Sequence, residues 1–495
     1  MDIKLEHENE NIEYKTSLDK LTNDIWSTYS AFANTNGGII VLGVSEEKDG
    51  YIEVGVINGP KLIQDFWNTI NNKEKVSKNI LDNRHVQQTI LPNGNMLIKI
   101  IVPEAHISDK PIYLNNNPKK TYIRLYEADC VATEEQLSTF FRDKSSKQDS
   151  VLLDNYLIED LSRETIYKYK QYISKDRDSY TTMSDEEFLK KIGVYCMDRN
   201  DGRKYKLTEA ALLFFGTEEA IRSRFSSFHL DYIDKRGIYT IQERWKDGVS
   251  FGDNQYADLN IFEFYLIVMD KLVSTINTPF KLVNGLERIS YENFITAIRE
   301  AFINTLVHAD YHSSLSNILV EVGDFFYKFK NPGCLRVELE EFISGGRSNP
   351  RNDLLVSLFR RIGLSERIGS GGPIIFQIPS QYDYRQPELQ TNLFQTELVI
   401  WSVDTITTIP NSTDEIRQVY NYLKQVRTEQ SVTNLMNKLK ISRYKIYKAL
   451  EFLEEHNLLY NRGKTRNRLY QIRLSPVEQI TMIDSMRKNI AKFMK

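Results

Sequence analysis

A run of fourteen residues, Ile295 to His308, most constrains what this chain can fold into. It reads ITAIREAFINTLVH and places Glu300, Asn304 and His308 four residues apart in a mostly apolar sequence. Residues four apart lie on one face of a helix, so the run predicts a helix with one polar stripe. A buried carboxylate, amide and imidazole are costly unless bonded, and a nucleotide phosphate with its Mg²⁺ would supply the contacts. The alternative is the solvated face of an amphipathic helix.

The residues that follow favour a ligand site. A strand-like run, Asn317 to Val322, precedes Asn331-Pro332-Gly333, and Gly369 to Gly372 then leads into Pro373. Glycines before a proline at a helix start leave backbone amides available to an anion. Such a stretch can also be an ordinary turn, but its order after the polar helix favours a nucleotide site.

The segments EAFINTLVHADY, NPGC, RSNPRN and ERIGSGG resemble a known family. They are similar to the divergent ATP-binding domain of the GHKL class in bacterial RecG-like proteins and predicted transcriptional regulators. The resemblance implies a GHKL-like α/β sandwich that binds ATP and Mg²⁺, with Glu300 orienting the attacking water and Asn304 as a metal ligand. It implies cofactor contacts from Asn304, His308, Asn331, Gly333, Arg351, Gly369, Gly371 and Gly372.

Two departures from this family bear on the chemistry. Asn331 stands where more typical members carry an Asp that reads adenine, and Ala309 interrupts the usual HRDY. The resemblance therefore implies nucleotide binding more directly than hydrolysis.

The start of the chain gathers carboxylates around an apolar strand. Glu8, Glu10 and Glu13 precede Lys15, and Glu46 follows the strand expected over 39–44. Carboxylates brought together from separate elements can hold a divalent metal for phosphodiester cleavage, or they can form a solvated acidic surface.

This region also resembles a family, through ENENIEYKTSL, AFANTNGGIIVLGV and YIRLYEADCVAT. These segments are similar to the Schlafen-type AlbA_2 domain, whose relatives include metal-dependent ribonucleases and DNA-binding modules. The resemblance implies catalytic roles for Glu8, Glu13 and Glu46, with Glu8 and Glu13 as metal ligands. Ser45 and Glu46 replace the usual Asp-rich turn, and YEADC replaces the customary Gly-Ser-Ser stretch with its Arg.

The end of the chain is predicted to form three helices and a basic hairpin. The helices are expected over 414–426, 431–439 and 442–455, with Ser412 or Thr413 capping the first and Ser442 the third. This order resembles a winged helix-turn-helix, although such domains also bind proteins. The residues expected to contact nucleic acid are Arg443, Tyr444, Lys445 and Lys448 on the third helix, which would enter a groove, and Arg462, Lys464, Arg466 and Arg468 on the wing, which would hold phosphates.

Charge supports a polyanionic partner. The net charge is −3, yet from Pro410 onward 17 Lys and Arg stand against 8 Asp and Glu. A basic end on an acidic body suggests that this end meets nucleic acid, either DNA or RNA.

Length and composition indicate an α/β multidomain protein. No apolar run reaches the length of a membrane span, and no secretory signal is visible. The three cysteines are scattered, which favours buried thiols in a reducing compartment. We therefore expect a cytoplasmic location. We expect a homo-oligomer. The predicted divisions are 1–142 (AlbA_2-like), 149–285 (mostly helical connection), 286–404 (GHKL-like), 412–475 (winged helix) and 476–495 (terminal helix).

Two functions remain open. The first is an ATP-responsive DNA-binding regulator. The second is a metal-dependent nuclease acting on RNA or DNA, gated by ATP and used in defence against phage.

Overall fold

The chain folds into two compact units, Met1–Ser146 and Lys147–Lys495, and the division falls inside the predicted linker at 144–149. Both units are mixed α/β, as predicted. Gly369, Lys464, Arg466 and most of the predicted terminal helix lie outside the described residues. The computed structural model describes residues 7–47, 50–144, 147–174, 180–238, 244–276, 281–283, 287–289, 291–314, 317–346, 348–363, 371–463, 468–475, 477–480 and 482–483.

The first unit packs its helices against two small sheets. One sheet has the strand order β1-β2-β6-β5, with β1 and β2 parallel, and the other has the order β7-β8-β9. The apolar helix α1 is buried along most of its length and supplies much of the core. The elements are β1 Ile12–Lys15, α1 Ile25–Asn34, β2 Gly38–Leu42, β3 Val44–Glu47, β4 Gly50–Glu53, α2 Gly59–Ile70, η1 Asn83–His85, β5 Val86–Ile90, β6 Met96–Val102, β7 Tyr113–Leu114, β8 Asn117–Leu125, β9 Ala128–Val131 and α3 Glu134–Asp143.

The strand expected over 39–44 is divided at Gly43. This glycine has φ +95°, and a Cβ there would lie 2.8 Å from the Cα of Gly55. Only glycine fits this backbone conformation and this close approach. The strand therefore ends at Leu42, and Glu46 lies on a separate exposed hairpin strand, β3.

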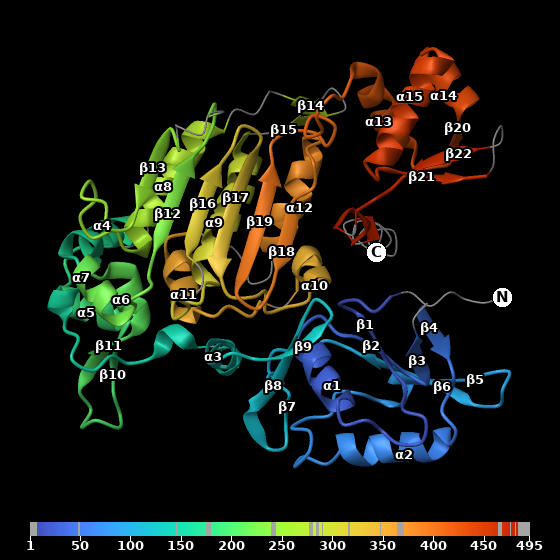
Figure 1. Cartoon of the computed structure of the whole chain (residues 1–495). Coiled ribbons are helices and arrows are strands. Elements are labelled where there is room, and N and C mark those ends of the chain that lie inside the picture. Colours follow the sequence, from blue (N-terminus) through green and yellow to red (C-terminus); the bar gives the residue numbers. More distant parts are fainter. Residues whose placement is uncertain are drawn as a thin grey trace, which may run out of the picture. The chain divides into compact units, whose positions relative to one another are not determined.

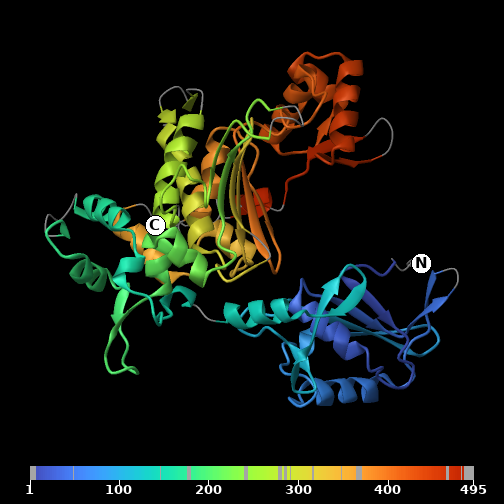
Figure 2. The same cartoon turned by 60° about the vertical axis from the view of Figure 1, so that its left-hand side comes forward.

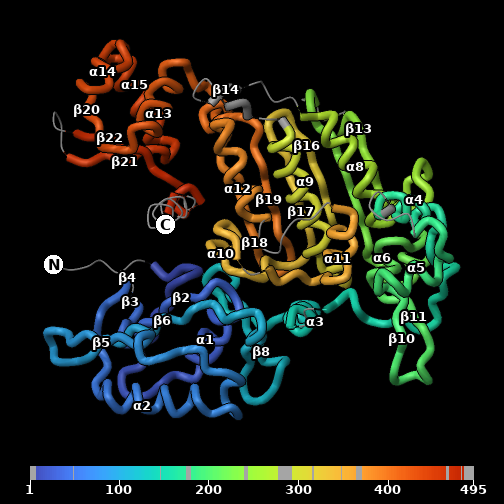
Figure 3. The backbone as a smooth tube through the Cα atoms, turned by 180° about the vertical axis from the view of Figure 1, so that it is seen from behind, coloured from blue at the N-terminus to red at the C-terminus, as the bar shows by residue number. Residues whose placement is uncertain are grey.

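The second unit is built on a six-stranded sheet in the order β13-β12-β16-β17-β19-β18. Helices α8, α9 and α12 lie on one face of it, as Figures 1 and 3 show from opposite sides, and Figure 2 shows strands and helices as two layers. The elements before and within this domain are η2 Gln148–Ser150, η3 Ile158–Asp160, α4 Arg163–Ser174, α5 Asp185–Ile192, β10 Tyr195–Met197, β11 Tyr205–Leu207, α6 Glu209–Phe215, α7 Glu218–Arg224, β12 Leu230–Asp234, β13 Asp247–Ser250, α8 Ile261–Thr275, β14 Lys281–Val283, β15 Glu287–Ile289, α9 Tyr291–Val307, β16 Ile318–Val322, β17 Phe326–Pro332, α10 Leu339–Ser344, α11 Asp353–Arg361, α12 Gly371–Gln381, β18 Glu388–Thr391 and β19 Gln395–Trp401.

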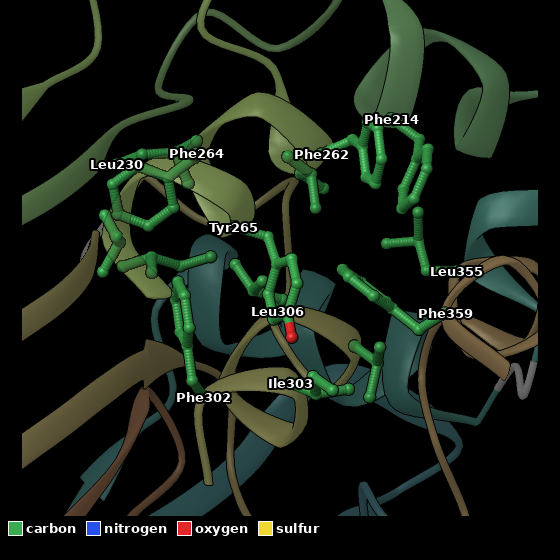
Figure 4. Close-up of a cluster of buried hydrophobic side chains, with 14 of the residues drawn as sticks. Phe214, Leu230, Phe262, Phe264, Tyr265, Phe302, Ile303, Leu306, Leu355 and Phe359 are labelled. Atoms are coloured by element: carbon green, nitrogen blue, oxygen red, sulfur yellow. The ribbon is translucent and has the colours of Figure 1, made fainter. Parts of the chain in front are cut away.

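One core joins the predicted connecting region to this sheet. Figure 4 shows Phe214 of α6, Tyr265 of α8, Phe302 of α9 and Phe359 of α11 in one cluster. The Tyr265 ring stacks on Phe302 at 5.6 Å and meets the edge of Phe359 at 5.2 Å. The structure thus differs from the predicted division at residue 286, because β12 pairs in parallel with β16 and belongs to the same sheet.

Asp149 attaches the first element of this unit to α11. Its Oδ2 accepts the Leu355 N–H at 2.9 Å, and the Gln148 N–H donates to the Arg351 carbonyl at 3.2 Å. The carboxyl is buried, and burial raises the pKa of Asp149 to about 7 even though backbone N–H groups of Leu355 and Leu354 favour the ionised form. A buried acid whose pKa is raised on folding is most compatible with the fold while it is protonated.

We expect the free energy of unfolding to fall, between about pH 4 and pH 8, by up to about 4 kcal/mol more in the wild-type protein than in Asp149→Asn. The folded carboxyl keeps its proton up to about pH 7, whereas the unfolded chain releases it near the ordinary value of 3.8, so stability declines as pH rises through this window. Denaturant titrations at several pH values measure the difference. Asp270→Asn, at an exposed position of α8, is the control, and parallel curves for Asp149→Asn and wild type would contradict the expectation.

The end of the chain forms three helices and a small sheet, in the predicted order and with nearly the predicted bounds. The Thr413 side chain caps α13 by accepting the Ile416 N–H at 3.4 Å, as predicted. Ser442 stands at the N-cap of α15, but its side chain makes no capping hydrogen bond, which corrects that detail. The elements are α13 Asp414–Val426, β20 Gln430–Ser431, α14 Val432–Leu439, α15 Arg443–Glu455, β21 Leu459–Arg462 and β22 Leu469–Ile472, with sheet order β20-β22-β21.

Within the described ranges, none of the helices combines the length and the apolarity needed to cross a bilayer.

Candidate functional site

The polar stripe of α9 faces a cavity. Glu300, Asn304 and His308 all line one cavity of about 360 Å³ between the helix layer and the sheet. Glu300 is only 7% exposed, which contradicts the alternative of a solvated face for this residue. The spacing therefore predicted the shared face correctly.

Three walls complete the cavity. The sheet contributes one wall, α10 and the segment after it a second, and α11 with the first turn of α12 the third. Apolar rings and aliphatic side chains alternate with polar groups, as in sites that bury a small organic ligand. The sheet wall consists of Phe329, Asn331, Leu389, Thr396 and Leu398, and the other two walls include Phe342, Asn349, Asp353, Val356, Ser357, Arg360, Gly371, Gly372 and Ile375.

His308 is neutral in this environment. Burial lowers the pKa of His308 to about 3, and the Arg351 and Arg336 guanidinium groups lower it further. A neutral imidazole has one donor and one acceptor nitrogen, so His308 can form hydrogen bonds but cannot neutralise a phosphate.

The glycines that begin α12 lie directly against the stripe. A Cβ on Gly371 would overlap the Glu300 Oε1 and lie 2.9 Å from the Asn304 Nδ2, and a Cβ on Gly372 would overlap the Phe342 carbonyl oxygen. Any larger residue would push α12 away from α9 and α10. These two predicted residues are therefore at the cavity, while Gly369 lies outside the described part of the chain.

Arg351 and Gly333 lie behind the cavity wall, not among the residues that line it. Arg351 is fully buried and donates to the His308 carbonyl at 2.9 Å and the Cys334 carbonyl at 2.8 Å. Gly333 has φ +92°, and a Cβ there would lie 2.7 Å from the Arg351 Cζ. In the structure both residues support the wall, whereas the resemblance implied that they contact the cofactor.

Two arginines that sequence reasoning missed do line the cavity. Arg336 is buried and donates from Nη1 to the Pro350 carbonyl at 3.2 Å, and Arg360 lies on α11 one turn after Val356. The position of Arg336 three residues after Gly333 was the available signal. These cations could balance the negative charge of a ligand.

The carboxylates of the first unit are close enough to interact. Burial raises the pKa of Glu8, and the negative charges of Glu13 and Glu46 raise it further. Glu8 accepts the Tyr14 N–H at 2.8 Å.

Cations already occupy both oxygens of Glu13. Its Oε1 lies 2.7 Å from the Lys15 Nζ and its Oε2 lies 2.8 Å from the Arg124 Nη2. Arg124 also pairs with Asp129 at 2.8 Å, and Lys15 with Asp24 at 2.7 Å. Among the described residues no group of three or more His, Cys, Asp and Glu is arranged to hold a metal ion. A metal ion at Glu13 would have to displace Lys15 or Arg124 from its oxygens.

The predicted nucleic-acid contacts are exposed in part. Arg462 is 84% exposed, and Lys448 and Arg468 are also exposed. Lys445 is also exposed, but it forms an ion pair with Glu415 of α13, and this pair holds the pKa of Glu415 at about 2. Lys464 and Arg466 fall outside the residues that the structure describes.

The part of the sheet that runs from β16 into β19, with α10, α11 and α12, lies in a segment that matches an ATPase-type family model. Residues 318–400 match the family model "Putative ATP-dependent DNA helicase recG C-terminal", and residues 8–131 match "Schlafen, AlbA_2". The chain thus carries a Schlafen AlbA_2 domain and a RecG-type C-terminal ATPase-like domain, as the sequence resemblances implied. Residues 138–231 match a domain of unknown function (DUF8451). The stripe on α9 precedes the segment matched by the ATPase-like model.

Among solved structures, the DIP2311 protein from Corynebacterium diphtheriae is similar over 96% of this chain and 94% of its own, with 16% sequence identity and a TM-score of 0.40. The chain has no match among curated proteins.

Proposed function

We propose that this chain is an ATP-responsive nucleic-acid-binding protein, and specifically a DNA-binding transcriptional regulator. The observation that carries the nucleotide part is the cavity lined by Glu300, Asn304 and Asn331 in an ATPase-like domain. The AlbA_2 and RecG-type domains support a nucleic-acid-related function associated with ATP.

The residues of the cavity fit Mg²⁺-ATP. Asn304 would hold Mg²⁺ through its amide oxygen, and the metal would neutralise charge on the phosphates. Glu300 would orient a water molecule, and Gly371 and Gly372 would present backbone N–H groups at the start of α12.

Asn331 can serve in place of an aspartate. Its Nδ2 donates to the Pro332 carbonyl at 2.9 Å, which leaves the amide oxygen as an acceptor. An acceptor there would receive a hydrogen bond from the exocyclic amine of adenine, whereas the carbonyl of guanine would meet another acceptor.

The nuclease alternative has less support. Its carboxylates interact, but Lys15 and Arg124 engage both oxygens of Glu13, so binding a metal would require breaking buried ion pairs.

The experiment that tests the proposal measures nucleotide binding to the full chain by isothermal titration. Asn304→Ala should weaken Mg²⁺-ATP binding at least about tenfold because it removes a metal ligand, and should leave binding of ATP in EDTA unchanged. Glu300→Ala should spare binding and abolish any hydrolysis.

Asn254→Ala, at an exposed amide away from the cavity, is the matched control. Wild-type protein that binds no ATP, or an Asn304→Ala variant with unchanged Mg²⁺-ATP affinity, would refute the assignment of this cavity.

A further inference from the structure

The outward face of α15 carries aromatic rings that the fold does not use. Ile446, Ala449, Leu450 and Leu453 point into the core of the C-terminal domain. Tyr444 and Tyr447 lie outside this core and are 68% and 43% exposed. Burying an aromatic ring is favourable, so rings left exposed on a helix beside basic residues point to a partner.

Each exposed ring has a cation of the same helix beside it. The Lys448 Nζ lies 5.0 Å from the centre of the Tyr444 ring, and the Arg443 guanidinium lies 5.8 Å from that of Tyr447. Within each pair the ring and the cation are four residues apart, and the two pairs form neighbouring stripes on the exposed side of α15. They present a row of alternating apolar and positive groups.

Lys445 belongs to a different side of the helix. Its ammonium group is paired with Glu415 on α13, while the Lys445 side chain is still 58% exposed. Both lysines are exposed, but Lys445 pairs with a carboxylate of another helix, whereas Lys448 lies against the Tyr444 ring of its own helix.

The shape and charge of this surface select the partner. An exposed helix face is convex and fits the major groove of B-form DNA, whereas the major groove of duplex RNA is too deep and narrow to admit a helix. The basic groups lie in the first half of α15, and Glu451, Glu454 and Glu455 follow. The N-terminal part of a recognition helix is the part that contacts base edges.

We propose that Tyr444 and Lys448, and not Lys445, read base edges of duplex DNA in the major groove. The proposal rests on the proposed nucleic-acid-binding function and names its partner and its specificity residues. The Tyr444 ring would contact a thymine methyl group, and Lys448 would donate to acceptors on a purine edge. Arg462 and Arg468 would contact phosphates.

The test compares matched lysine variants of the full chain. A 30-base-pair duplex is selected by the wild-type protein from a random library, and its affinity is compared with that of the unselected duplex pool by fluorescence anisotropy. Lys448→Met and Tyr444→Ala should each weaken binding to the selected duplex about tenfold and binding to the pool less than about threefold. Lys445→Met should change both by less than about threefold, and Tyr444→Phe should retain the wild-type affinity.

Each other outcome overturns the proposal in a recognisable way. A loss in Lys445→Met as large as that in Lys448→Met, or equal losses on both duplexes, would show that this face does not read sequence. Tighter wild-type binding to single-stranded DNA or to duplex RNA would exclude the proposed partner while leaving nucleic-acid binding in place. Absence of binding to any of these nucleic acids would refute the proposed function as well.

Discussion

Replacing Arg124 with Met should lower the free energy of unfolding of the first unit by about 3–5 kcal/mol. The Arg124 side chain is only 3% exposed and pairs with Glu13 and Asp129, each at 2.8 Å. It also donates to the Asn9 carbonyl at 3.0 Å and lies over the Phe32 ring. Methionine would fill similar space but leave the nearly buried Asp129 without its cation and Glu13 with Lys15 alone. A buried charge that loses its partner in this way is among the costliest single changes.

Scanning calorimetry of the full chain measures this loss as a fall in the unfolding temperature of the first unit on the order of 10 °C. Lys119→Met is the control, because the pair between Lys119 and Glu134 is exposed and 3.4 Å long, and we expect its loss to cost less than about 1 kcal/mol. Adding Glu13→Gln and Asp129→Asn to Arg124→Met should recover part of the stability, because neutral side chains cost less to bury. Equal losses of unfolding free energy in Arg124→Met and Lys119→Met would show that the buried ion pairs stabilise the first unit no more than the exposed pair does.

The same ring of ion pairs explains why the carboxylates of the first unit were hard to interpret from sequence. Glu8, Glu13 and Glu46 do interact, as their clustering suggested. The more deeply buried of the two cations that pair with Glu13, however, is Arg124 on β8, which lies 111 residues later in the chain. Sequence spacing gives no information about such a distant partner.

Local signals predicted the C-terminal elements well. The capping residue Thr413, the apolar periodicity of α13 and the turn between α14 and α15 act within a few residues, so the bounds of all three helices followed from the sequence. The ion pair between Lys445 and Glu415 depends on how α13 and α15 pack. Local sequence patterns could not predict this pair, and it is the reason why we propose Lys448 and not Lys445 as a base contact.

Long-range pairing accounts for what was missed in the second unit. The stripe on α9 was predicted because it needs only helical periodicity. The membership of β12 in the sheet depends on parallel pairing with β16, which comes only after β13, α8 and α9. A short strand in a stretch that is otherwise mostly helical is easily taken for part of a helical region. Arg336 lies outside any helix or strand and Arg360 lies on α11, and both reach the cavity only through the way the segment between β17 and α12 folds.

Replacing Arg351 with Met should destabilise the second unit by about 3–4 kcal/mol. The guanidinium donates to the His308 and Cys334 carbonyls at 2.9 and 2.8 Å and contacts the Cys334 Sγ at 3.4 Å. Its loss would leave partly buried backbone acceptors without this donor and would remove the surface on which Gly333 packs. The wall that follows Gly333 contains Cys334 and Arg336, so we expect nucleotide binding to weaken as a consequence of this loss of support.

The Arg360→Met variant distinguishes a residue that contacts the nucleotide from one that only supports the cavity wall. Arg360 lines the cavity, so its removal should weaken ATP binding while leaving the unfolding temperature of the ligand-free protein within about 2 °C of wild type. Arg351→Met should lower that temperature before any nucleotide is added. If Arg351→Met kept the wild-type unfolding temperature and lost ATP affinity, Arg351 would contact the nucleotide directly. The role that the family resemblance implied would then replace the one that its hydrogen bonds indicate.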